Sequence, residues 1–102
     1  MSDAEEKPFK YEIKFSSKFK KHLKLVTKRR TENAIKIKEV SDMLQRGEKL
    51  PERYHDHELI GNWAGHRECH ILPDLLLIYR IIENILILEM VDTGSHSDLF
   101  SK

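Results

Sequence analysis

The chain has 102 residues, of which 39% are hydrophobic and 34% charged, a size that allows one compact domain and leaves no room for a second. Its single cysteine, Cys69, excludes an intramolecular disulfide and fits a reducing compartment. The longest apolar region, Ile71 to Val91, is interrupted by charged residues, whereas a membrane span needs about 20 mostly apolar ones. Because the polar and acidic Met1–Pro8 lacks the pattern of a secretion leader, we expect a cytoplasmic protein.

The net charge of +1 hides an uneven distribution of charged residues. Twelve of the eighteen Lys and Arg residues lie between Lys7 and Lys38, together with only two of the seventeen acidic residues. A block this basic in an otherwise acidic chain is typical of a footprint for a polyanion. A solvated helix face is the alternative, and for a charge run alone it is the better explanation.

The N-terminal part begins with residues 1–8, for which we expect a disordered extension, and residues 9–102 should form the domain. From Phe9 to Phe15 apolar and charged residues alternate, which predicts a half-buried strand.

Two helices should follow this strand. Ser16 or Ser17 can cap the first of them, and the second should run from about Thr31 to about Arg46, with Gly47 ending it. Because the link between the helices is short, we expect an antiparallel helical hairpin.

The C-terminal half reads as a loop followed by strands. We expect a loop from Leu50 to Asn62, strands at Ala64–Leu72, Leu75–Ile82 and Ile85–Val91, and a closing segment at Ser95–Phe100. The predicted order is therefore β-α-α-β-β-β, an α+β domain in which two N-terminal helices pack on one face of a small, mainly antiparallel sheet.

Histidines gather in this half of the chain. Four of the six lie between His55 and His70, and His96 lies in a Gly-Ser-His turn near the C-terminus. Histidine can accept and donate protons near neutral pH without a large pKa shift. Several histidines from different loops and strand ends of one sheet therefore predict a reactive surface.

Two alternatives to acid–base chemistry can be weighed from spacing. His55 and His57 could share a metal ion only if their loop bends, and His66 and His70 would be about 13 Å apart on an undistorted strand. Metal–nitrogen bonds are about 2 Å long, so the sequence predicts no metal site. Cys69 and His70 are neighbours that face opposite sides of a strand, which argues against a thiol enzyme.

Metal-free cleavage of RNA by its own 2′-hydroxyl is the third possibility. This reaction needs a base, an acid and a positive charge near the phosphate. His57, His70, Asp74 and His96 could transfer the protons, and Arg67 could stabilise the phosphate. The basic residues of the predicted helices that would hold the polyanion are Lys20, Lys21, Lys24, Lys28, Arg29 and Arg30.

The residues also form a longer pattern. It reads Tyr54-x-Asp56-His57-x-Leu59-x-Gly61-x-Trp63-x-Gly65-x-Arg67-x-x-His70-x-x-Pro73-Asp74, then Leu77-Ile78-Tyr79, then Thr93-Gly94-Ser95-His96-x-x-Leu99-Phe100. This pattern resembles the YafQ branch of the RelE-type toxins, and the resemblance covers essentially the whole chain after the N-terminal tail. It implies a RelE-like fold and a toxin of a type II toxin–antitoxin pair. Such a toxin is a ribosome-dependent endoribonuclease that cuts messenger RNA in the decoding site and so inhibits translation.

The resemblance also implies roles for single residues. His57, His70, Asp74 and His96 match the family's catalytic residues, and Phe100 matches a C-terminal aromatic of the site. Which residue is base and which is acid stays open. We favour His96 for proton transfer to the leaving group, and His70 with Asp74 for the 2′-hydroxyl side. The role of Arg67 is inferred from charge and placement alone.

The implied partners are a cognate antitoxin, the ribosome with its rRNA and mRNA, and operator DNA through the antitoxin complex, with neither a membrane nor a cofactor involved. One departure is Leu75, which stands where the member that gives this branch its name has a tryptophan, and which could change codon preference or rate. Two other functions stay open: a non-catalytic module with a toxin fold that only binds antitoxin or RNA, and a metal-dependent nuclease.

Overall fold

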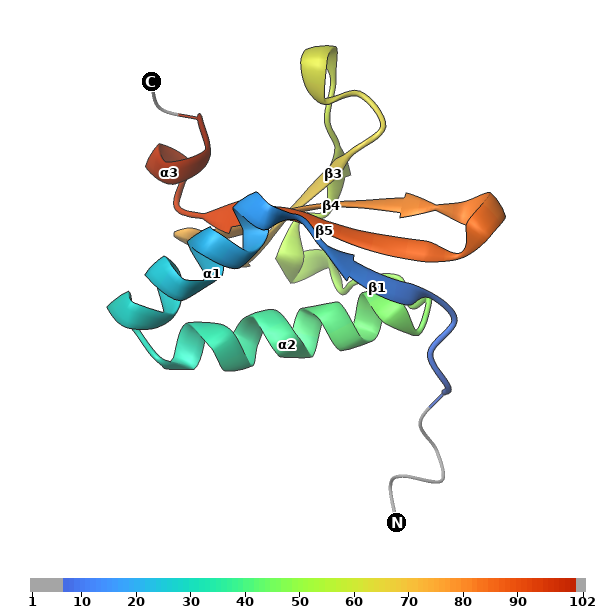
Figure 1. The fold of residues 1–102 in the computed structure, drawn as a ribbon, viewed down its shortest axis with the longest axis horizontal. Helices are drawn as coiled ribbons and strands as arrows, with labels where there is room; N and C mark the ends of the chain where they lie inside the picture. Colours follow the sequence, from blue (N-terminus) through green and yellow to red (C-terminus); the bar gives the residue numbers. More distant parts are fainter. Residues whose placement is uncertain (1–6, 101–102) are drawn as a thin grey trace.

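The structure is a computed structural model that describes residues 7–100, so residues 1–6 of the predicted extension lie outside the described part. Its main elements, in chain order, are β1 (Glu12–Phe15), α1 (Ser17–Arg29), α2 (Glu32–Gln45), β2 (His57–Glu58), β3 (Arg67–Leu72), β4 (Leu75–Ile82), β5 (Ile87–Gly94) and α3 (His96–Phe100). Figure 1 shows α2 on one side of the sheet and α3 on the other.

The strands form one sheet in the order β1-β5-β4-β3-β2. β1 pairs in parallel with β5, and the other three pairs are antiparallel. α1 packs against β5, and α2 packs against α1 and β3. The prediction of an α+β domain with two N-terminal helices on one face of a mainly antiparallel sheet is confirmed.

The two long helices begin and end where local chemistry requires it. The backbone N–H of Phe19 donates to Oγ of Ser16 at 2.9 Å, so Ser16 is the N-cap of α1, one of the two caps predicted. After α2, Gly47 adopts a positive φ of 83°, a conformation that glycine reaches without steric cost.

The hydrophobic core lies between the sheet and these helices. α1 contributes Phe19 and Val26, and α2 contributes Ile37, Val40 and Leu44. The strand residues of the core include Cys69, Ile71, Leu75, Leu77, Tyr79, Leu88 and Met90. Because side chains alternate along a strand, the residues between them face the other side of the sheet, away from the helices.

The structure differs from the predicted elements mainly at strand ends. β1 is shorter than the predicted Phe9–Phe15, and β5 continues beyond Val91 to Gly94 because it pairs with β4 over its whole length. β2 lies within the segment predicted as loop, because two residues there pair with β3. Such pairing depends on a distant strand and leaves no local pattern.

The connection from β2 to β3 forms an arm, residues 59–66, that rises from the sheet on the side away from α2 (Figure 1). The backbone N–H of Leu59 donates to the carbonyl of His66 at 2.9 Å and closes the base of the arm. Within the arm, the rings of Trp63 and His66 meet edge to face. Trp63 therefore packs within the arm, against His66. Among the described residues, no helix is long and apolar enough to span a membrane.

Candidate functional site

The face of the sheet turned away from α1 and α2 carries a cluster of two histidines and a glutamate. Cys69 and Ile71 of β3 belong to the core, so Glu68 and His70 point to the opposite face. In the register of β2 and β3, His57 stands directly across from Glu68. Cross-strand partners lie within side-chain reach, and this register brings together residues that are eleven or more positions apart.

Glu68 lies at the centre of this cluster. One of its carboxylate oxygens, Oε1, lies 3.0 Å from Nε2 of His57 and 3.8 Å from Nε2 of His70. Its side chain is only 6% exposed, and the second oxygen, Oε2, has no hydrogen-bond partner among the described residues. A buried carboxylate is costly unless it is satisfied, so this side chain is held in an environment that favours a nearby donor or cation.

His57 has an acceptor at each ring nitrogen. Nε2 faces the carboxylate of Glu68, and Nδ1 lies 3.2 Å from the carbonyl oxygen of Glu58. Because carboxylate and carbonyl oxygens only accept, the doubly protonated imidazolium alone could donate to both at once. The two contacts fix the orientation of the His57 ring beside Glu68.

The same cluster could hold a metal ion. One ligand atom each from His57, Glu68 and His70 can lie within 4.8 Å of the others, and two imidazole nitrogens with one carboxylate oxygen are a donor set that suits zinc or copper. The prediction of no metal site rests only on pairs of histidines within one segment. Glu68 lies outside any such pair, because its place beside His57 depends on the pairing of β2 with β3.

His96 and Phe100 lie on α3 and are in ring contact, with their centroids 5.4 Å apart. Across the sheet, His70 is paired with Leu76, and Leu76 is paired with Gly94, the last residue of β5. α3 begins two residues later, so it starts from the same end of the sheet as His70. Figure 1 shows α3 and the arm on the same side of the sheet.

Asp74 lies apart from the three histidines, in the tight turn between β3 and β4. It is exposed and lines a pocket of about 480 Å³ together with Arg29, Arg30 and Lys36 at the junction of α1 and α2. Within residues 7–100, no hydrogen bond or ion pair joins Asp74 to His57, His70 or His96. The structure thus brings His57 and His70 together and places Asp74 beside the basic helices.

Arg67 faces away from His70, because an odd number of positions along β3 separates the two residues. Its guanidinium lies 3.0 Å from a carboxylate oxygen of Asp56 and 3.7 Å from one of Glu58. Asp56 also accepts a hydrogen bond from the buried hydroxyl of Tyr79. These contacts connect the segment before β2 to the sheet, so they give Arg67 a structural task that its charge alone does not indicate.

The basic residues predicted to hold RNA are all exposed, but they differ in their partners. Lys20, Lys21, Lys24 and Lys28 cover the surface of α1, and no ion pair among the described residues involves them. Arg29 instead donates two hydrogen bonds to Asp98 of α3, and Arg30 lies 3.1 Å from Glu32.

A second pocket, of about 570 Å³, borders His70 at the open edge of β3. Basic and aromatic side chains line it, among them Lys36, Arg53, Tyr54 and His55. The guanidinium of Arg53 stacks over the ring of Tyr54, and the ring of His55 meets that of His70 edge to face. Glu39 also lines the pocket and lies 4.0 Å from Lys36. A pocket with two basic side chains and aromatic walls next to a site histidine offers room for a nucleotide.

The structure also places Cys69 and His22. Cys69 is fully buried, and burial raises the pKa of its thiol, which confirms its assignment to the core. His22 of α1 is half-buried, and its Nδ1 lies 2.6 Å from the buried carboxylate of Asp92 on β5. The sequence gives α1 a polar position there but cannot show which strand lies beneath it.

Comparison with known proteins places this chain in one class of protein. A family model described as a bacterial toxin of type II toxin–antitoxin systems, YafQ, matches residues 11–101. The mRNA interferase toxin YafQ of Escherichia coli K12 is 37% identical over 90 residues, which cover 87% of this chain and 95% of that protein.

Solved structures agree with this match. YafQ in the E. coli DinJ–YafQ complex is 35% identical with a TM-score of 0.78, covering 88% of this chain and 98% of that one. A metal-bound toxin from Helicobacter pylori is 39% identical with a TM-score of 0.81, covering 88% of this chain and 99% of the other. The protein is therefore a toxin of a type II toxin–antitoxin system, with the RelE-like fold. Within that class, the chain belongs to the YafQ family.

Proposed function

We propose that this toxin is a ribosome-dependent endoribonuclease that cuts messenger RNA in the decoding site by metal-independent acid–base chemistry. The observation that carries the proposal is the cluster of His57, Glu68 and His70 on the face of the sheet turned away from α1 and α2, at the end from which α3 begins with His96. The name of the E. coli relative, an mRNA interferase toxin, supports the same activity.

The proposed reaction is an attack of the RNA on itself. A base removes the proton of the 2′-hydroxyl, the 2′-oxygen forms a bond to phosphorus, and the bond from phosphorus to the 5′-oxygen breaks. An acid delivers a proton to that departing oxygen, which leaves a 2′,3′-cyclic phosphate on one fragment and a 5′-hydroxyl on the other. No electron donor, cofactor or metal ion is needed for this balance.

Chemistry and the family resemblance support a role for each residue in this reaction. His70 acts on the 2′-hydroxyl, with Asp74 in the neighbouring turn on the same side of the reaction, and His96 protonates the leaving oxygen. His57 is oriented by Glu68 and helps to neutralise the charge that builds up on the phosphate. Phe100, in contact with His96, offers a face on which a base can stack. Leu75 is buried, so it offers no such surface.

Substrate binding uses the cations outside the cluster. Lys20, Lys21, Lys24 and Lys28 of α1 contact the RNA backbone, assisted by Arg30. The pocket beside His70 takes a nucleotide next to the cut. Arg29 and Arg67 contribute less to RNA binding than their charge implies, because carboxylates already hold both of them.

The proposal also covers partners and location. The E. coli relative has been solved in complex with DinJ, and we expect this toxin to bind a cognate antitoxin of its own and, through it, operator DNA. A toxin that acts on translating ribosomes works in the cytoplasm.

Two substitutions test the proposal. His70→Ala and His96→Ala should each abolish message cleavage on translating ribosomes and restore growth to cells that express the toxin, while the circular-dichroism spectrum stays that of the wild type. Unchanged toxicity with both substitutions would refute the assignment. Folded wild-type protein that binds ribosomes but leaves every message intact would favour the non-catalytic binding module.

A metal-dependent nuclease is the second candidate, and the ligand set of His57, Glu68 and His70 is the observation that favours it. Cleavage can be assayed on intact ribosomes with a chelator selective for zinc and copper, which leaves the Mg²⁺ of the ribosome in place. Our proposal predicts an unchanged rate. Loss of activity that returns when Zn²⁺ or Cu²⁺ is added would replace it with the metal-dependent mechanism.

A further inference from the structure

Asp98 fixes the start of helix α3. This helix has only five residues, too few to be stable without support from its neighbours. The backbone N–H of Ser95 donates to Oδ2 of Asp98 at 2.8 Å, and the backbone N–H of Asp98 donates to Oγ of Ser95 at 3.1 Å. This reciprocal pair has the pattern of a capping box and satisfies two free donors at the N-terminus of the helix.

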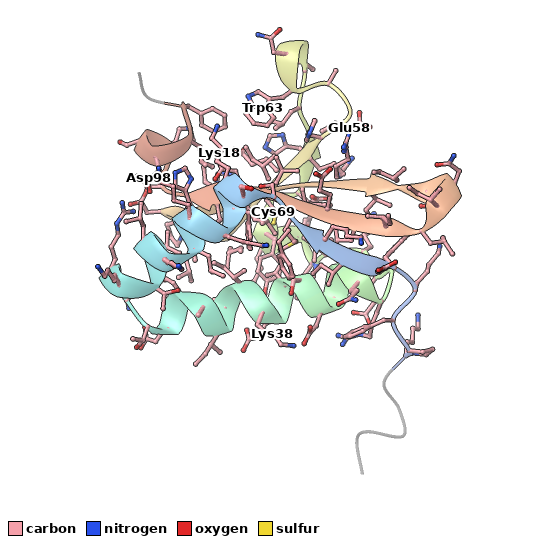
Figure 2. The ribbon with its side chains drawn as sticks, viewed as in Figure 1. Lys18, Lys38, Glu58, Trp63, Cys69 and Asp98 are labelled. Carbon is pink, nitrogen blue, oxygen red and sulfur yellow. The ribbon has the colours of Figure 1, made fainter. Side chains whose placement is uncertain are left out.

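The same carboxylate also binds the end of α1. Nη1 of Arg29 donates to Oδ2 of Asp98 at 2.6 Å, and Nη2 donates to Oδ1 at 3.1 Å. Two parallel hydrogen bonds from a planar guanidinium fix orientation as well as distance. Figure 2 shows Asp98 between α3 and α1, two elements that are 69 positions apart along the chain at this contact.

The strand before α3 leaves room for this arrangement only because it ends in glycine. A Cβ atom at Gly94 would lie 2.7 Å from Cβ of Asp98, closer than real Cβ atoms approach other atoms. The side chain of Asp98 is therefore in contact with the end of β5, with the cap of α3 and with α1. These contacts restrict the side chain of Asp98 and so hold α3 in one position relative to α1 and β5.

We propose that Asp98 and Arg29 are positioning residues that hold helix α3, and with it His96 and Phe100, in place for RNA cleavage. The inference rests on the proposed function, because the position of α3 matters to the reaction only if His96 acts on the substrate. It gives Arg29 a role other than the phosphate binding predicted from its charge. Since small displacements of a reacting group are costly, the pair should affect the rate of cleavage more than the binding of ribosomes.

The test compares single and double substitutions in single-turnover cleavage at saturating ribosome concentration. Asp98→Ala and Arg29→Ala should each lower the rate constant by roughly 10- to 100-fold. The double variant should be no slower than the slower single variant, because each substitution breaks the same link. Arg29→Lys should recover part of the rate, since lysine can still form one ion pair with Asp98.

The ion pair of Arg80 and Glu89 provides a matched control. It joins β4 to β5 with two hydrogen bonds, and its side chains are 41% and 28% exposed, against 49% and 22% for Arg29 and Asp98. Arg80→Ala and Glu89→Ala should leave the rate at the wild-type value. A structural readout accompanies the rates: in Asp98→Ala the amide hydrogens of α3 should exchange faster, while those of β3 to β5 keep their protection.

Each outcome either supports or overturns the positioning role of Asp98 and Arg29. Wild-type rates in both Arg29→Ala and Asp98→Ala, with His96→Ala inactive, would overturn the positioning role and leave the proposed function standing. Equal losses of cleavage rate in Arg80→Ala and Glu89→Ala would overturn it too, because the loss of any ion pair would then slow cleavage wherever the pair lies. If Asp98→Ala does not fold, Arg29→Ala and Arg29→Lys decide, and equal rates for those two would also contradict the inference. A wild-type protein that cuts no message would remove both proposals together.

Discussion

Glu68 is the residue on which the geometry of the site depends most. It is buried, it faces His57 and His70 at once, and one of its oxygens is left without a hydrogen bond among the described residues. A carboxylate that accepts from an imidazole fixes which ring nitrogen carries the hydrogen, and so fixes what the ring can do. An unsatisfied buried oxygen lowers stability, and such costs are often found where function requires them.

Glu68→Gln separates the effect of this carboxylate on the cleavage rate from its effect on stability. The amide is nearly the same size, but its NH₂ group can donate to the ring nitrogen that now donates to Glu68, which would reverse the hydrogen bond with His57. We expect the cleavage rate to fall by roughly 10- to 100-fold, while the free energy of unfolding stays the same or rises. Single-turnover cleavage and urea unfolding measure the two quantities, with Glu89→Gln as the control. A variant that unfolds readily but cleaves at the wild-type rate would contradict this role.

Cys69 provides a prediction about chemical reactivity. The thiolate is the reactive form, and burial of Cys69 raises the pKa of its thiol. The folded protein should therefore resist alkylation by iodoacetamide at neutral pH and react fully only in denaturant, as followed by mass spectrometry. Cys69→Ala should still cut RNA. Rapid labelling of the native protein, or loss of activity in a folded Cys69→Ala, would reopen the thiol mechanism.

At the scale of elements, α3 depends on charge for its position. The hydrogen bonds from Arg29, followed by those from Ser95, lower the pKa of Asp98 in the folded protein below its usual range. The contribution of Asp98 to stability is therefore fully present above the pKa that it has in the unfolded chain, about 4, and is lost as the pH falls through the lower folded value.

The predicted loss of stability at low pH can be tested with Asp98→Asn, whose side chain cannot titrate. Below about pH 4 the free energy of unfolding of the wild type should fall more steeply than that of Asp98→Asn, and the two proteins should change in parallel between pH 6 and pH 8. Urea unfolding at a series of pH values gives both curves. Parallel curves throughout would show that the carboxylate of Asp98 gains nothing from folding.

Local patterns in the sequence predict most of these elements, and pairing between distant segments accounts for the rest. Ser16 and Gly47 mark helix ends through their own backbone chemistry, so the helices could be predicted from a few residues. β2 could not, because it exists only through pairing with β3. His57 and His70 could be predicted as site residues from the clustering of histidines in the sequence. Glu68 could not, because its contacts with both depend on the pairing of β2 with β3.

Exposed lysines lie on α1 without ion pairs to described residues, whereas a lysine of α2 is held in an ion pair. The lysines of α1 are exposed and form no ion pairs with described residues, whereas Lys38, on the outer side of α2 in Figure 2, is paired with Asp42. A polyanion bound by the lysines of α1 would lie along the same helix that Arg29 joins to α3. In this arrangement, one element both holds the substrate and supports the part of the site that carries His96.

The salt dependence of ribosome binding tests whether the lysines of α1 contact RNA. Binding of the toxin to ribosomes should weaken steeply as salt concentration rises, because counterions are released from RNA on association. Lys24→Gln and Lys28→Gln should each reduce the slope of log Kd against log salt by about 1, whereas Lys38→Gln should leave it unchanged. Filter binding at several salt concentrations measures the slope. A flat response in the wild type would rule out α1 as an RNA-binding surface.

The most direct test of the central claim, cleavage by the RNA's own 2′-hydroxyl, uses a message with a single altered nucleotide. The cut position is first mapped on ribosome-bound message, and the nucleotide before the cut is then replaced by its 2′-deoxy counterpart. We predict that the unmodified message yields a 2′,3′-cyclic phosphate and a 5′-hydroxyl, and that the substituted message is not cut at that position. Cleavage of the 2′-deoxy message there, with a 5′-phosphate on the downstream fragment, would contradict the account.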